Sequence, residues 1–427
     1  MKIQISNGRV IDPANDIDRN ADVFIADGVI VGVGKMPAGF EANGSLDATG
    51  CIVCPGLVDL SARLREPGYE YRATLESEMA AAAAGGVTSL ACPPDTDPPL
   101  DEPGLVEMLK HRARLPEFAH VYPVGALTEK LAGVNLTEMA ELAEAGCVAF
   151  GQANTAIVDT QVLLRAMQYA ATFGFPVWMQ AQDPFLAKLG VAHDGEVATR
   201  LGLGGIPVAA ETIALATILQ LARETGARIH LTRISSAVGL EMIVAARRSG
   251  ISATCDVAVH HLHLSEHDIG YFDPHARLDP PLRSQSDREA LRRGLADGSI
   301  NAVCSDHTPV DDDAKQVPFD EAEPGATGLE LLLPLTLKWA SEIKLPLVHA
   351  LARVTCDPAR ILGVEAGTLA VGAAADVCIF DPQAAYPVNR ATLKSQGKNT
   401  PFLGLELQGR VRGTLIDGHL AYDGSWS

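Results

Sequence analysis

The sequence predicts an α/β protein, a (β/α)8 TIM barrel accompanied by a small β-sandwich domain. Three observations lead to this prediction. Strand-like apolar runs alternate with helix-like segments through the middle of the chain, and short strands with Asp-Gly turns gather at both ends. The 427 residues are enough for a large core plus a second unit, and the composition, 47% hydrophobic and 20% charged, is that of a globular protein.

The two ends of the chain show the same sequence pattern of short strand-like runs separated by turns. Near the N-terminus, Asp22–Ile25 and Val29–Val33 flank an Asp-Gly turn, and similar runs recur at Asp376–Asp381 and around 409–418. Two separate β modules would explain this pattern. One sandwich built from both ends explains it better, because each half is too small to bury a core alone. We therefore divide the chain into a composite β-sandwich domain, 1–55 with 366–427, and a barrel domain, 56–365.

The middle of the chain reads as repeated strand–helix units. Such repeats imply a parallel sheet, and eight of them suit a closed barrel. A doubly wound open sheet is the structural alternative, but no G-x-G-x-x-G follows a strand to support it. The expected strands are 52–60, 87–92, 120–125, 147–150, 176–180, 228–233, 251–257 and 300–306, and the expected helices include 75–84, 105–113, 136–145, 162–173, 209–225 and 240–249.

The net charge limits the kinds of partner that the chain can bind, and the cysteine content indicates the compartment in which it works. Subtracting 53 acidic from 34 basic residues gives a net charge of −19, which argues against nucleic acid or an anionic membrane as a partner. We find no signal segment at the N-terminus and no apolar run long enough to span a bilayer, so we expect a cytoplasmic protein. The eight scattered cysteines are expected to be core thiols in a reducing compartment.

The segment 55–68, Pro-Gly-Leu-Val-Asp-Leu-Ser-Ala-Arg-Leu-Arg-Glu-Pro-Gly, runs from an apolar strand into a polar turn. It resembles the first barrel strand of the dihydroorotases, within the amidohydrolase superfamily, which reads close to P-G-L-V-D-x-H-x-H-x-R-E-P-G. In that family the two histidines hold a catalytic metal; here they are Ser61 and Arg63. Serine is a poor zinc ligand, and a guanidinium does not deprotonate in a protein.

The resemblance covers essentially the whole chain, and it implies that the other metal positions are also replaced. Gln152 (or Ala153) stands where the family has an aspartate, and Gln180 and Arg233 stand where it has histidines. Only Asp306, a metal ligand and proton shuttle in the family, is retained, as a vestigial residue. We therefore expect no metal, no cofactor and no catalytic residue, and hence a chain that is not an enzyme. We also expect a guanidinium, from Arg63 or Arg233, to pair with Asp306.

Four further positions match the family's substrate contacts and would form a vestigial pocket. Arg65 corresponds to the arginine that grips the substrate carboxylate, although a structural salt bridge is an equal possibility. Asp95 and Asp279 replace asparagines, and Val310 replaces a histidine. The run His260-His-Leu-His looks like a metal cluster, but we expect it to serve packing or surface roles.

The pattern resembles the catalytically silent dihydroorotase-like chains that accompany bacterial aspartate carbamoyltransferase in pyrimidine biosynthesis. The resemblance implies a structural subunit that binds the catalytic chain of that enzyme, as a homo-oligomer within a hetero-oligomeric complex. Two alternatives stay open. One is an anion- or nucleotide-sensing regulatory protein that uses an Arg63, Arg65 and Arg233 pocket. The other is a metal-independent cyclic-amide hydrolase that uses Asp306 and His307.

Overall fold

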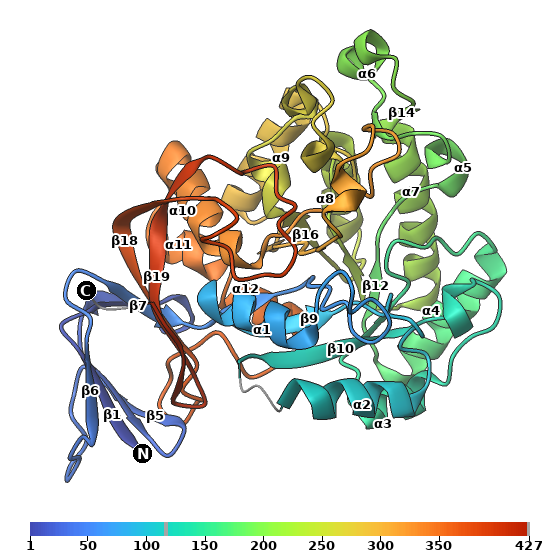
Figure 1. Cartoon of the computed structure of the whole chain (residues 1–427). Helices are drawn as coiled ribbons and strands as arrows, with labels where there is room; N and C mark the ends of the chain where they lie inside the picture. Colours follow the sequence, from blue (N-terminus) through green and yellow to red (C-terminus); the bar gives the residue numbers. More distant parts are fainter. Residues whose placement is uncertain (115–117, 425–427) are drawn as a thin grey trace.

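The computed structural model describes residues 1–114 and 118–424, and its centre is an eight-stranded parallel barrel (Figure 1). The strands follow one another in chain order, and a bridge between Ala62 and His307 links the segments that follow the first and last strands. The predicted (β/α)8 fold is thus confirmed. The barrel strands are β8 (Leu57–Asp59), β9 (Val87–Cys92), β10 (His120–Ala126), β11 (Ala149–Gly151), β12 (Val177–Met179), β15 (Ile229–Leu231), β16 (Ala253–Ala258) and β17 (Ala302–Cys304).

Helices connect these strands and surround the barrel, and local capping explains where several of them begin. Thr74 and Ser77 form a capping box at the start of the first helix, and Asp159 and Ser284 cap two later ones. The α-helices are α1 (Leu75–Ala84), α2 (Pro103–Arg114), α3 (Met139–Ala145), α4 (Thr160–Phe173), α5 (Pro184–Ala187), α6 (Glu196–Leu201), α7 (Val208–Thr225), α8 (Ala237–Arg248), α9 (Gln285–Asp297), α10 (Leu332–Ile343), α11 (Leu347–Ala352) and α12 (Cys356–Leu362).

The segment expected as one strand, 52–60, is divided between two sheets. Ile52–Pro55 forms β7 of a terminal sheet, and the barrel strand β8 begins at Leu57. Gly56 lies at the junction, where a Cβ would stand 2.1 Å from the Thr88 hydroxyl oxygen. Only glycine permits this close approach to the second barrel strand. Gly56, which was expected inside one continuous strand, is therefore the junction between the two sheets.

Both ends of the chain meet in one six-stranded sheet, in the order β20-β19-β18-β7-β2-β3, beside a four-stranded sheet in the order β5-β4-β1-β6 (Figure 1). This pairing explains why both ends of the chain show the same pattern of short strands. The domain boundaries at 55 and 366 stay a prediction. The strands are β1 (Lys2–Ser6), β2 (Arg9–Asp12), β3 (Ile17–Asn20), β4 (Val23–Ala26), β5 (Val29–Val33), β6 (Gly44–Asp47), β18 (Val377–Pro387), β19 (Glu406–Ile416) and β20 (His419–Asp423), with a short pair β13 (Ala192–His193) and β14 (Gly205–Ile206) above the barrel.

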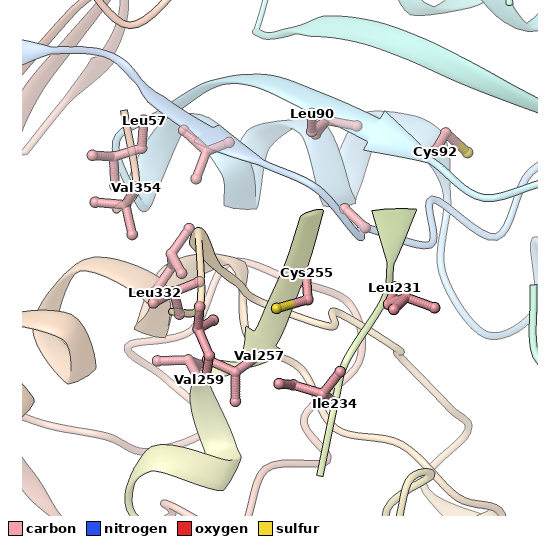
Figure 2. Packing of buried hydrophobic residues seen from close by; sticks show 14 of the residues in the cluster. Leu57, Leu90, Cys92, Leu231, Ile234, Cys255, Val257, Val259, Leu332 and Val354 are labelled. Carbon is pink, nitrogen blue, oxygen red and sulfur yellow. The ribbon is translucent and has the colours of Figure 1, made fainter. Parts of the chain in front are cut away.

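The main core lies where the barrel strands meet the surrounding helices. Leu57, Leu90 and Leu231 come from three barrel strands, and Leu332 comes from α10 (Figure 2). All four are fully buried, and this continuous packing holds the strand ends in place around the barrel mouth. Among the described residues, no helix combines the length and the apolarity needed to cross a membrane.

Candidate functional site at the barrel mouth

Arg63 is the centre of a hydrogen-bonded network at the carboxyl ends of the barrel strands. Its Nε donates to Asp95 Oδ2 over 2.7 Å, and its Nη2 donates to Asn154 Oδ1 over 2.7 Å. Its Nη1 donates to Thr308 Oγ1 over 2.9 Å and lies 3.4 Å from Asp306 Oδ1. Arg63, which is 5% exposed and follows the first strand, therefore has partners from the second, fourth and eighth strand ends.

Arg233 approaches the same carboxylate from the end of β15. Its Nη1 donates to Asp306 Oδ1 over 3.0 Å, and its Nη2 donates to Asn154 Oδ1 and to Gln180 Oε1. The expectation that a guanidinium pairs with Asp306 is therefore confirmed, and it holds for both arginines. Arg233 and Asp306 both have positive φ, 53° and 46°, a backbone region that residues other than glycine rarely adopt unless their surroundings hold them there.

Asn154 joins the two arginines, although no motif in the sequence marks it as a site residue. Its Oδ1 accepts from both guanidinium groups, and its Nδ2 donates to Asp279 Oδ2 over 2.9 Å. Asp279 Oδ1 also accepts from Gln180 Nε2 over 3.3 Å. Asn154 follows a barrel strand within three residues, and this placement was the signal that would have identified it.

The electrostatics of the network favour its charged forms. Burial alone would lower the pKa of Arg63, but Asp95 and Asp306 outweigh burial and raise it above its usual value. Burial would likewise raise the pKa of Asp95, and the Arg63 guanidinium outweighs that effect and holds the pKa low. Arg63 and Arg233 form ion pairs with Asp95 and Asp306, so two of the three arginines of the alternative anion pocket already have carboxylate partners within the chain.

Arg65 and Val310 lie beside the network without joining it. Arg65 Nε donates to the carbonyl of Pro309 over 2.8 Å, and among the described residues Arg65 forms no salt bridge, which was the alternative role considered for it. Burial, with Arg63 nearby, lowers the pKa of Arg65 to about 10. Val310 is buried, and its amide donates to Asn399 Oδ1 over 3.1 Å, so it belongs to a clamp between strand eight and the C-terminal segment.

Ser61 and Gln152, two other replaced positions, do not contact Asp306. Gln152 Nε2 donates instead to Thr128 Oγ1 over 2.6 Å. Ser61 lines a small cavity beneath the arginines, together with Trp178, Thr232 and Arg233. Its volume, about 30 Å³, is enough for a water molecule or two and too small for a substrate-sized ligand.

The donor set at the barrel mouth does not fit the metal centre that the resemblance would imply. Around Asp306 stand two guanidinium groups, which offer no lone pair, and amides, which are weak ligands for a transition metal. Asp306 has two arginine partners on one oxygen, which would have to leave before a cation could bind. No reaction step is therefore assigned to a metal at this position.

The remaining histidines near the barrel mouth are buried and packed, and His261 and His307 also form hydrogen bonds. His260 stacks on Phe402 at 5.8 Å, and His261 bonds the carbonyl of Pro281, so the expected packing role of this histidine run is confirmed. His307 Nε2 pairs with the buried Glu78 over 2.6 Å. His307 therefore faces away from the Arg63 network, and the geometry gives no support to an Asp306–His307 acid–base pair.

A separate group of possible ligands lies at the other end of the barrel. His120 begins β10, and its Nε2 stands 3.1 Å from Asp376 Oδ2 and 3.8 Å from Asp417 Oδ2. The ligand atoms of the three residues lie within 4.8 Å of one another. The members of this group are far apart in the chain and form no motif, so the sequence alone did not predict it.

Comparison with known proteins supports the barrel fold and indicates the family of the chain. The family model described as dihydro-orotase-like matches residues 50–238. A "Dihydroorotase-like protein" of Pseudomonas aeruginosa is 46% identical over 99% of this chain and 100% of its own length, and a "Dihydroorotase" of Geobacter sp. (strain M21) is 41% identical over 99% of both. An L-hydantoinase (dihydropyrimidinase) structure from Arthrobacter aurescens superimposes with a TM-score of 0.88 at 25% identity, covering 99% of this chain and 96% of that one.

These comparisons correct one expectation. The prediction that the chain is not an enzyme was wrong, because relatives named dihydroorotase and hydantoinase structures point to an amidohydrolase enzyme. His120, Asp376 and Asp417 also form a group that could hold a metal ion, outside the positions that the resemblance implied. Replaced ligands at one set of strand ends are therefore too narrow a basis for assigning the whole chain. With full-length relatives of up to 46% identity and a matching barrel, this chain belongs to the dihydroorotase-like family of amidohydrolase type.

Proposed function

We propose that this dihydroorotase-like chain takes part in pyrimidine biosynthesis by binding the catalytic chain of aspartate carbamoyltransferase and holding it in a higher-order assembly. The observation that carries the proposal is the ion-paired barrel mouth, where Arg63 and Arg233 converge on Asp306. The cavity beside these arginines has a volume of only about 30 Å³, so the outer surface is the part of the molecule that is available to a large partner.

The charge of the chain fits such an assembly. A net charge of −19 disfavours close approach between copies of this chain unless a partner supplies complementary basic residues. A stable interface of this kind buries more than about 1,000 Å² of surface. We expect this chain to form a homo-oligomer within a hetero-oligomeric complex that also contains the transferase chain.

Co-expression of the two chains tests the proposal. Size-exclusion chromatography with light scattering should show a complex that contains both chains, and the transferase should be less assembled and less active when this chain is omitted. Raising the salt concentration should weaken the complex if charge complementarity contributes to it. A transferase that assembles and works equally well without this chain would contradict the proposal.

A second candidate function, turnover of a cyclic amide, is favoured by the names of the relatives. Dihydroorotase and hydantoinase both denote amidohydrolases, and dihydroorotate is therefore the first substrate to assay. Turnover by the purified chain, alone and in the complex, should be compared with that of Asp306→Asn. Turnover that survives this substitution would place the chemistry away from the Arg63 and Arg233 network.

A further inference from the structure

The group formed by His120, Asp376 and Asp417 lies at the opposite end of the barrel from the Arg63 network. His120 is the first residue of β10, Asp376 precedes β18, and Asp417 lies in the turn between β19 and β20. The barrel contributes one residue and the six-stranded sheet contributes two. These three side chains therefore join parts of the chain that are up to 297 residues apart, since 417 − 120 = 297.

The distances from His120 to the two carboxylates are close to those between ligands in a metal coordination shell. Zinc bound by imidazole nitrogen and carboxylate oxygen at about 2.0–2.1 Å in a tetrahedron places its ligands about 3.3–3.4 Å apart. The observed distances from His120 Nε2 to the two carboxylate oxygens, 3.1 and 3.8 Å, lie on either side of this value. The Asp417 side chain is 58% exposed and is free to move the few tenths of an ångström required.

Among the described residues, the only side chain that can offer Asp376 and Asp417 a positive charge at ion-pair distance is His120 itself. Within residues 1–114 and 118–424, neither Asp376 nor Asp417 forms an ion pair with a lysine or an arginine. Asp376 is buried, and its second oxygen accepts the Asp417 amide hydrogen over 2.9 Å, which directs Oδ2 toward His120. Two carboxylates and one imidazole are a donor set that a divalent cation neutralises.

A groove gives access to the group from solvent. His120 and Asp417 line a groove of about 600 Å³, together with Tyr122, Lys110 and Arg114. A three-ligand site beside open space leaves room for water or a small anion as the fourth ligand, which is the arrangement of an open zinc site. The groove also supplies the entry path that a metal site requires.

We propose that His120, Asp376 and Asp417 bind one zinc ion, which links the barrel to the six-stranded sheet and keeps one coordination position open toward the groove. The proposal is independent of the transferase partner and of the barrel mouth. The competing arrangement is a protonated His120 held between the two carboxylates, which needs no metal. The two arrangements differ in whether the chain takes up zinc.

The test uses the purified full-length chain, stripped with a chelator and titrated with zinc by calorimetry. We expect one zinc per chain, a rise in melting temperature on addition of zinc, and visible absorption bands of a low-coordinate site when Co²⁺ replaces it. His120→Gln and Asp417→Asn should each weaken zinc binding at least tenfold and remove the zinc-dependent rise in melting temperature. His419→Gln, a change at another histidine of the same groove, should leave both unchanged.

Zinc uptake with the same stoichiometry and affinity in the wild type and in both ligand variants would overturn the proposal, as would absence of uptake by the wild type. Circular dichroism checks that each variant is folded. If His120→Gln fails to fold, Asp417→Asn carries the test, because its side chain is largely exposed and its backbone contacts are retained.

Discussion

Arg233 Nη1 donates to Asp306 Oδ1 over 3.0 Å, although the two residues follow barrel strands that are separated by β16. Both side chains are buried, at 4% and 7% exposure. The same oxygen also faces Arg63 Nη1 at 3.4 Å, so two guanidinium groups share one acceptor. A family position associated with a metal ligand thus holds a buried ion pair, whose stability depends on every partner being present.

Removing one arginine from this network should be strongly destabilising. Arg233→Met leaves Asp306 with less compensation in a buried site, and we expect a loss of about 3–5 kcal/mol in the free energy of unfolding. Urea denaturation followed by circular dichroism measures the loss. Arg248→Met, an exposed change on α8, should stay within about 0.5 kcal/mol. A loss for Arg233→Met no larger than that of the control would show that the pair contributes little.

Asp59 should make stability depend on pH. Burial raises its pKa from 3.8 to about 6, despite hydrogen bonds from Ser305. Because the folded state holds this proton more tightly than the unfolded state, the contribution of Asp59 to stability falls as pH rises from about 4 to about 6. The stability of the wild type relative to Asp59→Asn should therefore drop by up to about 3 kcal/mol across that window. Parallel pH profiles for the two proteins would contradict this prediction.

Asn399 should hold the C-terminal segment against the loop after β17. Its Nδ2 donates to the carbonyls of Thr308 and Gly325, and its Oδ1 accepts from the Val310 amide. Asn399→Ala leaves these buried backbone groups without partners. Each group left unsatisfied lowers the free energy of unfolding by about 1–3 kcal/mol. We expect a total loss of about 2–4 kcal/mol in the free energy of unfolding, since water will satisfy some of the groups.

Hydrogen exchange provides a local readout for the same variant. The Val310 amide should exchange faster in Asn399→Ala than in the wild type, because its acceptor is removed. Asn20→Ala, at an exposed position in β3, should change neither stability nor this exchange rate. Unchanged protection of Val310 would mean that another group holds the loop.

Gly56→Ala should disturb the junction between the terminal sheet and the barrel. The new Cβ would stand 2.1 Å from the Thr88 Oγ1 and 2.3 Å from its Cγ2, which is too close without movement of the strands. We expect a loss of about 1–3 kcal/mol, partly recovered by adding Thr88→Ala. Gly44→Ala, where a Cβ would meet nothing within 4 Å, is the matched control. Equal melting temperatures for the two single variants would contradict the prediction.

The sequence by itself determined the fold class and the positions of the polar strand ends. The patterns of apolar residues that distinguish strands from helices depend only on neighbouring residues in the chain. For this reason the barrel strands from β9 onward and the helices α1, α4 and α7 lie close to where these patterns predicted them. The pairing of Arg63 or Arg233 with Asp306 was also predictable, since a buried aspartate needs a cation and both positions lie at strand ends.

Only the tertiary structure decided which of these groups meet. Asn154 joins the two arginines, Gln152 bonds Thr128, and the first predicted strand divides at Gly56. No local pattern of apolar and polar residues predicts any of these three features. The group of His120, Asp376 and Asp417 likewise arises where the barrel meets a sheet built from both ends of the chain. The physical reason is that such contacts depend on strand register and sheet closure, which bring together residues that are distant in sequence and carry no common pattern.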